Sequence, residues 1–306
     1  MIKVAVLMST YNGQKYLCEQ IESILSQNSV EVEIFIRDDG SSDSTRDILA
    51  DYVEKYSNIH VDFAENVGVG NSFMNLLYSV PDTFDYYSLA DQDDIWENNK
   101  LIESINLLQK SGKLLYGSNQ ECVDKYGASI GLRYNPNEKI HQSPISILEK
   151  NMIAGCTMVL SCKLFKVLTE KNNRPSPSLL RNRIHDVWIA MIASLYDGIV
   201  YDPRSFIKYR QHENNVVGAK SNFSRRLKER LKKVRHSEYR NGRSLLAKEL
   251  TIKFPEEIKR YPLIEICSQS HSFKGKIKIL KNGKQLRSYT KESRFSFFIK
   301  VMFGVF

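Results

Sequence analysis

The chain has 306 residues, 42% of them hydrophobic and 26% charged, which suits a globular protein with one large domain and an appendage, or with two domains. Its five cysteines are scattered and form no C-x-x-C pair, which argues against a disulfide framework or a zinc site and favours a reducing compartment. The net charge of +9 comes from residues 221–306, which hold 22 Lys/Arg against 7 Asp/Glu, whereas residues 1–220 hold 22 against 28.

The N-terminal apolar run, MIKVAVLM, meets the polar residues STYNG too early to form the core of a signal peptide. No apolar run elsewhere approaches the roughly 18 residues that a membrane-spanning helix needs. We therefore expect neither a secretion signal nor a transmembrane helix.

Short apolar runs and segments of helical periodicity alternate through the first 120 residues. They predict strands at residues 2–8, 32–36, 59–64 and 85–90, and helices at 17–25, from about 43 to 56 and at 72–78. Such alternation predicts an α/β fold, with a mostly parallel sheet covered by helices on both faces.

The pattern is less regular beyond residue 120. Residues 126–144 are turn-rich, 152–160 form a strand-like run interrupted by Gly155, and 172–178 (NNRPSPS) indicate a loop. Residues 184–196 predict a buried helix, and 198–210 predict two short strands.

Polar segments follow all four strands predicted in the first 120 residues. Ligands of such sheets bind outside the carboxyl ends of the strands, so these segments belong to one edge. Each segment alone is explained by turn formation, because N-G and D-G are turn formers, but four at one edge predict a ligand site. They are STYNG (9–13), DDGSS (38–42), ENVG (65–68) and DQDD (91–94).

The last of these segments places three carboxylates, Asp91, Asp93 and Asp94, within four positions. Carboxylates this close raise one another's pKa unless a cation or hydrogen-bond donors balance them, so the segment predicts a metal or nucleotide site. The alternative is a helix cap, with Asp94 ahead of Ile95-Trp96-Glu97. A cap accounts for Asp94 but not for Asp91 and Asp93 together.

Seven motifs in order give the chain a family resemblance over about residues 1–220. They are STYNG, RDDGSSDST, N-x-G, DQDDIW, AGCTMV, HDVW and YRQHENNVVG. The chain resembles the family 2 nucleotide-sugar glycosyltransferases of the GT-A fold, and within them the bacterial rhamnosyltransferase-like branch that builds O-antigen, capsule or cell-wall polysaccharide. The resemblance implies a Rossmann-like GT-A domain at 1–220, with a nucleotide-binding half at about 1–120 and an acceptor half at about 121–220.

The resemblance also implies a divalent cofactor, Mn²⁺ or Mg²⁺, because a cation neutralises the leaving diphosphate. Asp93 is expected on the metal, and Asp91 is expected near the ribose or sugar with a share in the metal site. Asp94 could share the metal role instead, because related sequences differ in which carboxylate reaches the ion. His212 is expected on the metal or the diphosphate, although a lone histidine is more often a surface or packing residue. Arg210 is expected to contact the diphosphate as a bidentate donor.

Nucleotide contacts are implied for the first three polar segments. Tyr11 would stack on a pyrimidine, with hydrogen bonds from Thr10 and Asn12, and Asp39 would accept the N3–H of the base. Asp38 is expected to brace its loop. Asn66 and Gly68 would close over the nucleotide, although Asn66 is equally explained as a turn residue.

Asp186 matches the general base that deprotonates the acceptor hydroxyl for in-line attack with inversion. The alternative for Asp186 is a cap of the helix that begins at His185-Asp186. Trp188 is either an acceptor platform or, on so apolar a helix, a core residue. Further donor or acceptor contacts are implied for Asp94, Gly155, Cys156 and His185.

The C-terminal residues 221–306 resemble the family less and are interpreted on physical grounds. Phe223, Leu227, Leu231 and Val234 recur at helical spacing among lysines and arginines, which predicts a basic amphipathic helix on an anionic membrane. The chain ends FSFFIKVMFGVF, too short to span a bilayer. The alternative is a solvated helix packed on the catalytic domain. Without a recognised nucleic-acid motif, we expect no nucleic acid partner.

Together these features predict a metal-dependent inverting glycosyltransferase that is cytoplasmic and peripheral on the inner face of the cell membrane. Its expected donor is dTDP-rhamnose, or second a UDP-hexose, and its expected acceptor a lipid-linked saccharide. One alternative is a nucleotidyltransferase, against which STYNG has only one glycine where that class carries a glycine-rich phosphate loop. The other is a membrane-surface binding protein with a decayed site, against which Asp39, Asp91, Asp93 and Asp186 are all retained.

Overall fold

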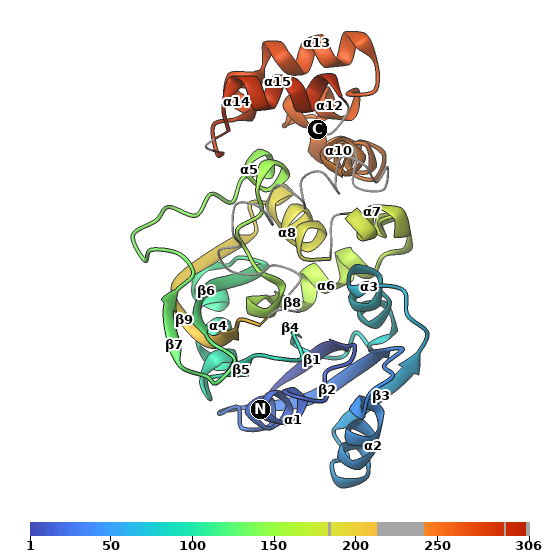
Figure 1. Cartoon of the computed structure of the whole chain (residues 1–306), viewed down its shortest axis with the longest axis vertical. Coiled ribbons are helices and arrows are strands. Elements are labelled where there is room, and N and C mark those ends of the chain that lie inside the picture. The colour runs from blue at the N-terminus through green and yellow to red at the C-terminus, as the bar shows by residue number, and fades with distance from the viewer. Residues whose placement is uncertain (183–184, 213–241, 291, 304–306) are drawn as a thin grey trace. The chain divides into compact units, whose positions relative to one another are not determined.

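The computed structural model describes residues 1–182, 185–212, 242–290 and 292–303 (Figure 1). The chain forms two compact units, which we describe separately. The first contains the described residues of Met1–Ile140, Ile153–Thr169 and Gly198–Gly218, and the second those of His141–Met152, Glu170–Asp197 and Ala219–Phe306. The boundary expected at residue 220 and the basic helix expected from Phe223 lie outside the described residues.

Four parallel strands form the N-terminal half of the sheet, as the sequence predicts. They are β1 (Ile2–Thr10), β2 (Val30–Asp39), β3 (Ile59–Ala64) and β4 (Tyr86–Ala90), in the spatial order β3-β2-β1-β4. Thr10 pairs with Asp38 and Asp39 pairs with Ala64, so the strands end nearly level. The four polar segments therefore lie along one edge of the sheet, which confirms that expectation.

Helices with one apolar stripe cover this half of the sheet. They are α1 (Leu17–Leu25), α2 (Thr45–Lys55), α3 (Val69–Ser79) and α4 (Lys100–Ser111). Alternate residues of β1, Val4, Val6 and Met8, are buried in one apolar cluster with residues of α1 and α4. Leu7 on the other face of β1 is also buried, and α3 packs against β1 and β2. Burial on both faces explains why β1 is a continuous apolar run.

The second half of the sheet is mixed in direction. It consists of β5 (Ile95–Trp96), β6 (Leu115–Val123), β7 (Ser129–Leu132), β8 (Val159–Ser161) and β9 (Ile199–Arg210). Within the described residues the sheet has nine strands, ordered β3-β2-β1-β4-β8-β6-β9-β5 with β7 beside β6. β8 is antiparallel to β4 and β6, β9 is parallel to β6, and β5 is antiparallel to β9. The predicted parallel arrangement thus holds for the first four strands.

The structure contradicts the two strands predicted at residues 198–210 and the alternative that Asp94 caps a helix. Residues 199–210 form the single strand β9, because the register against β6 shifts around Pro203 and the missing proline N–H falls at the irregularity. Asp94 caps no helix, because Ile95-Trp96 is strand β5, and the next helix, α4, begins at Lys100 after Asn99.

The first unit also contains a short 3₁₀ helix, η1 (Gly155–Thr157), and α6 (Cys162–Thr169). In the second unit the described elements are all helices. They form α5 (Pro144–Glu149), η2 (Lys171–Asn173), α7 (Pro177–Asn182), α8 (His185–Leu195), α10 (Gly242–Lys253), α11 (Pro255–Ile258), α12 (Pro262–Ser268), α13 (Phe273–Lys281), α14 (Gly283–Leu286) and α15 (Arg294–Met302). α8 is the predicted buried helix, with every residue except Asp186 buried. No helix in the described part of the chain combines the length and apolarity needed to cross a bilayer.

Candidate active site

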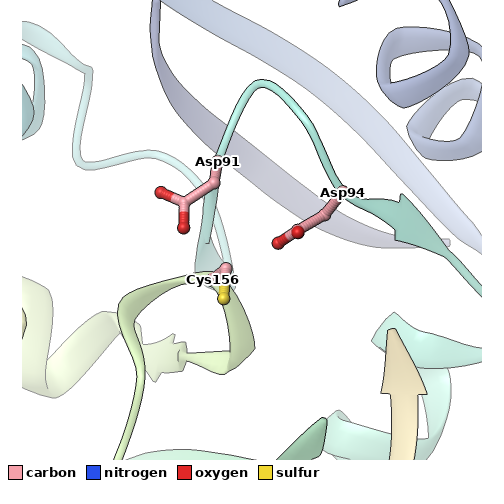
Figure 2. A group of neighbouring side chains, drawn as sticks. All are labelled: Asp91, Asp94 and Cys156. Atoms are coloured by element: carbon pink, nitrogen blue, oxygen red, sulfur yellow. The ribbon is translucent and has the colours of Figure 1, made fainter. Parts of the chain in front are cut away.

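The acidic segment 91–94 forms the turn that leads from β4 to β5. Asp91, Asp94 and Cys156 each offer one ligand atom, and these atoms lie within 4.8 Å of one another. Figure 2 shows the two carboxylates on the turn, with the thiol of η1 close by. Asp94 is fully buried and Asp91 is half-buried. The fold therefore concentrates negative charge at the carboxyl end of β4.

The acidic groups in this cluster repel one another when they are ionised, because their charges have the same sign. Burial, followed by the nearby charges of Asp93 and Asp91, raises the pKa of Asp94 well above its ordinary value. Burial, followed by the charges of Asp94 and Asp91, also raises the pKa of the Cys156 thiol. A divalent cation would reverse this balance, because it favours the ionised carboxylates.

The donor set of the cluster fits a hard cation. Oδ2 of Asp94 is buried and has no nitrogen or oxygen hydrogen-bond partner among the described residues. Mg²⁺ and Mn²⁺ take carboxylate oxygens, whereas a thiol suits softer metals. The Cys156 sulfur accepts a hydrogen bond from Gln120 Nε2 at 3.1 Å. The carboxylates are thus suitable metal ligands, and Cys156 is a buried residue next to them.

The end of β9 brings two more predicted residues to the acidic turn. Nε2 of His212 lies 2.7 Å from Asp93 Oδ2. The backbone N–H of Arg210 donates to Asp94 Oδ1 at 3.2 Å, and its Nε donates to the Asp93 carbonyl at 3.1 Å. Nη2 of Arg210 pairs with Glu19 at 2.5 Å. Arg210 is buried and holds the turn, while Asp93 and His212 are only partly buried.

Gln92 connects the acidic turn to the segment after β1. Its Oε1 accepts the N–H of Tyr11 at 2.9 Å, and its Nε2 donates to the Tyr11 carbonyl at 3.1 Å. The Tyr11 side chain is 50% exposed, as a platform for stacking must be. Gln92 was not predicted from the sequence, where its only signal is its position inside the acidic segment.

The predicted nucleotide contacts Thr10 and Asn12 are engaged with the loop after β2. Asn12 adopts a left-handed backbone with φ of 49°, donates its N–H to Ser41 and accepts the N–H of Ser42 on its side chain. Thr10 is buried and donates to Asp38 at 3.3 Å. Asp38 also accepts hydrogen bonds from Ser41 and Arg46, which fits its expected bracing role. Burial alone would raise the pKa of Asp38, but the Ser41 and Arg46 hydrogen bonds hold it below its ordinary value.

Asp39 ties the loops after β2 and β3 together. Its carboxylate accepts the backbone N–H groups of Val67 and Gly68, each at 2.9 Å, and pairs with Arg37 at 2.5 Å. Asn66 donates from its side chain to the Asp39 carbonyl at 2.9 Å. Both carboxylate oxygens of Asp39 are therefore occupied within the protein. Arg37, which sequence reasoning did not single out, is the buried cation that balances Asp39.

A buried lysine lies close to the acidic cluster. Lys100 is 1% exposed, its Nζ lies 3.1 Å from Ser88 Oγ, and the same atom sits 3.5 Å from the centre of the Trp96 ring. Burial lowers the pKa of Lys100 to about 7, and Cys156 and Asp94, where ionised, oppose the shift. A lysine near a helix start gives no sequence signal of burial, because lysine is almost always exposed.

A second cation lies on the Cys156 side of the cluster. Nη1 of Arg133 donates to Gln120 Oε1 at 2.6 Å, and Gln120 in turn contacts the Cys156 sulfur. The charge of Arg133 opposes the rise in the pKa of Cys156. Gly155 and Cys156, predicted as donor contacts, are both buried in η1. Arg133 was not predicted from the sequence, because it follows β7 in a stretch whose only clear signal is its many turn residues.

The remaining predicted residues lie on α8 of the second unit. Asp186 is partly buried, and its carboxylate accepts the N–H of Val187 at 2.7 Å. His185 is buried, and burial lowers its pKa to about 3, so the imidazole is neutral at pH 7. Trp188 is fully buried, with its ring 6.3 Å from that of Phe254, as expected for the core alternative.

Comparison with known proteins shows the family of the chain. Residues 5–168, more than half of the chain, match the model of Glycosyl transferase family 2. The chain is 31% identical over 252 residues to the dTDP-rhamnosyl transferase RfbG of Shigella flexneri, which covers 79% of this chain and 84% of that protein. It is 28% identical over 162 residues to the putative teichuronic acid biosynthesis glycosyltransferase TuaG of Bacillus subtilis, covering 51% and 61%.

Solved structures resemble it in fold. The crystal structure of S. aureus TarS 1-349 in complex with UDP aligns over 93% of this chain and 77% of that one, with a TM-score of 0.57 and 17% identity. This likeness concerns the fold alone, and it confirms the predicted GT-A architecture. From its acidic turn, its sheet and its relatives, the chain is a transferase enzyme that belongs to glycosyl transferase family 2.

Proposed function

We propose that the protein is a metal-dependent, inverting rhamnosyltransferase that uses dTDP-rhamnose. The sugar is proposed from the 31% identity to a dTDP-rhamnosyl transferase over most of both chains. A UDP-hexose is the second candidate donor. The acceptor is a lipid-linked saccharide of bacterial surface polysaccharide synthesis, as in O-antigen, capsule or cell wall, and the enzyme works at the inner face of the cell membrane.

The observation that carries the proposal is the cluster of carboxylates at the carboxyl end of β4, beside the exposed ring of Tyr11. Asp93, Asp91 and His212, with Asp94 sharing the role, would hold Mn²⁺ or Mg²⁺, which when bound neutralises charge on the leaving diphosphate. Oδ2 of Asp94, without a nitrogen or oxygen partner in the described structure, supports a cation close by.

The residues of the chain divide the remaining tasks. Tyr11 stacks on the base, with Thr10, Asn12 and Asp39 around it. Because the Asp39 carboxylate already accepts two backbone N–H groups, a bond to the base N3–H would use a further lone pair. Asn66, Gly68 and Asp91 complete the nucleotide site.

Asp186 acts as the general base that takes the proton of the acceptor hydroxyl. The buried side of the donor site is proposed to be formed by Asp94, Gly155, Cys156 and Arg210. His185 and Trp188 are proposed as acceptor-side residues that act by supporting the start of α8, because both are buried.

Calorimetric titration with dTDP, UDP and GDP, first with Mn²⁺ and then with EDTA, tests the proposal. We expect dTDP to bind more tightly than GDP and to lose affinity in EDTA. Asp93→Ala should bind dTDP equally with Mn²⁺ and with EDTA. Tighter binding of UDP would move the donor to a UDP-sugar, and no nucleotide binding in either condition would contradict the proposed site.

A further inference from the structure

Two helices of the second unit, α13 and α15, carry large apolar side chains that are exposed to solvent. α13 and α15 lie side by side (Figure 1), and Nζ of Lys276 on α13 donates to the carbonyl of Met302 on α15 at 2.8 Å. The side chains of Phe273 and Phe295 are 72% and 75% exposed. The full set of exposed apolar residues, which we name the α13–α15 surface, is Phe273, Ile277, Phe295, Phe298, Ile299, Met302 and Phe303.

The spacing in α15 separates an inner face from an outer one. Phe297 and Val301 are buried, one helical turn apart. Phe295, Phe298, Ile299 and Met302 follow the i, i+3, i+4, i+7 pattern of a second apolar stripe. At 3.6 residues per turn this stripe is centred about 130° from the buried face. Among the described residues the outer stripe is therefore exposed, as a docking surface must be.

α13 repeats the arrangement on a smaller scale. Gly275 and Ile279 are buried, while Phe273 and Ile277 lie about 160° away around the helix and are exposed. Lys276 lies next to the Phe273 and Ile277 stripe and reaches the C-terminal end of α15. The hydrogen bond from Lys276 to the Met302 carbonyl thus joins the two helices beside their outer stripes.

The charges around these stripes are almost all positive. Residues 273–303 contain nine Lys/Arg and one acid, Glu292. Glu292 is neutralised by an ion pair with Lys300 at 2.5 Å. Lys274, Lys278 and Lys281 on α13 are exposed. Apolar and aromatic side chains surrounded by lysines match the interface of an anionic bilayer, where rings enter the headgroup layer and amines meet phosphates.

A second copy of the chain is a poorer partner for the same surface. Face-to-face contact would bring two sets of lysines together without acids to balance them, and like charges across an interface oppose association. Charge therefore favours a lipid surface over self-association.

We propose that the α13–α15 surface docks the enzyme on an anionic phospholipid bilayer. Its apolar side chains insert at the level of the headgroups, and the lysines of α13 contact lipid phosphates. This docking deepens the proposed function, because it would bring the enzyme to the membrane that holds its lipid-linked acceptor. The biological role of the docking rests on the proposed function, but lipid binding itself does not.

Vesicle flotation of the full chain tests the docking. The lipids are phosphatidylcholine vesicles with and without phosphatidylglycerol, and the variant is Phe295→Ser/Phe298→Ser. We expect wild type to bind only the anionic vesicles, and the variant to bind them about tenfold or more weakly, because two interfacial rings are lost. Added salt should weaken the wild-type binding, because it screens the lysines.

The matched control is Tyr126→Ser/Ile130→Ser, which removes two comparably exposed apolar side chains from the first unit. This control should float like wild type, and all three proteins should unfold at similar temperatures. Equal flotation of Phe295→Ser/Phe298→Ser and wild type overturns the proposal, as does equal binding of wild type to both kinds of vesicle. A wild-type dimer that the variant lacks, without flotation, would instead assign the surface to self-association.

Calorimetry with dTDP separates the two proposals. The Phe295→Ser/Phe298→Ser variant should bind dTDP as wild type does, because its changes lie in another unit from the acidic turn. Lost flotation with intact dTDP binding supports the docking surface. Wild-type flotation without any nucleotide binding would retain the docking and contradict the proposed function.

Discussion

At the scale of single residues, the site depends on side chains that fix the backbone of the ligand loops. Gln92 pairs with both main-chain groups of Tyr11, so the orientation of the aromatic platform follows the acidic turn. Gly13 leaves room for the Gln92 side chain, because a Cβ built there would lie 2.3 Å from Gln92 Oε1. The need for glycine here is one of space, since Gly13 does not adopt a positive φ.

Gly13→Ala should therefore displace Gln92 and break both of its hydrogen bonds to Tyr11. Two such bonds contribute about 1–2 kcal/mol, so we expect affinity for the nucleotide to fall about tenfold with the fold retained. Calorimetry of dTDP binding measures the effect. Gln92→Ala is the partner variant in a double-mutant cycle. Adding Gly13→Ala to it should lower the affinity for dTDP only slightly. If the two variants lower that affinity additively, the proposed clash between a Cβ at position 13 and Gln92 is contradicted.

At the scale of elements, α8 starts with a histidine that folding keeps neutral. Burial lowers the pKa of His185 from 6.5 to about 3. Between these values the unfolded chain binds a proton that the folded chain excludes, so the free energy of unfolding rises with pH. The contribution is fully present above pH 6.5 and is lost as the pH falls below it.

His185→Gln should remove this dependence. Between about pH 7.5 and pH 5, wild type should lose about 2 kcal/mol more of its free energy of unfolding than the variant loses. Denaturant titrations of both proteins at several pH values measure the difference. If the free energies of unfolding of the two proteins fall equally with pH, His185 is protonated in the folded protein as readily as in the unfolded chain.

The sequence predicts those helices and strands whose apolar residues recur at an unambiguous spacing. β1 to β4 and α1 to α3 were predictable because their apolar residues recur at spacings of strand or helix, and the four polar segments then follow at one edge. β9 was predicted as two strands because Pro203 looks like a break, and only the register against β6 shows how the sheet accommodates it. Asp94 was ambiguous for a similar reason, since β5 is only two residues long.

The candidate site was predictable where polar residues cluster in sequence, and not where the fold gathers them. Asp91, Asp93 and His212 were all singled out, and Asp93 and His212 do meet. Lys100, Arg133 and Arg37 were missed, because an isolated basic residue carries no sign of burial. Their positions depend on tertiary packing, which local pattern does not encode.

At the scale of the whole molecule, the proposed tasks fall on different units. The acidic turn belongs to the first unit, and the proposed general base Asp186 belongs to the second. The positive charge also concentrates in residues 221–306, so the protein is polarised along its sequence. Such polarity directs association with anionic surfaces and weakens with salt.

Asp186→Asn should leave nucleotide binding intact and lower sugar transfer, by about 10²–10⁴-fold if the residue is the general base. Calorimetry and a transfer assay on the same preparation separate these effects. Asp197→Asn, an exposed substitution just after α8 with a left-handed backbone that asparagine tolerates, is the control and should transfer normally. Loss of nucleotide binding in Asp186→Asn would make Asp186 a structural residue.

The contacts of β9 with the acidic turn have a consequence for folding. The hydrogen bonds from Arg210 and His212 join residues 116 to 119 positions apart, so closing them carries the entropy cost of a long loop. We expect the turn to reach its native geometry only after the strands between have assembled. A ligand held there would bind the native state alone and so raise the unfolding temperature of the entire sheet, which makes thermal shift a global report of occupancy.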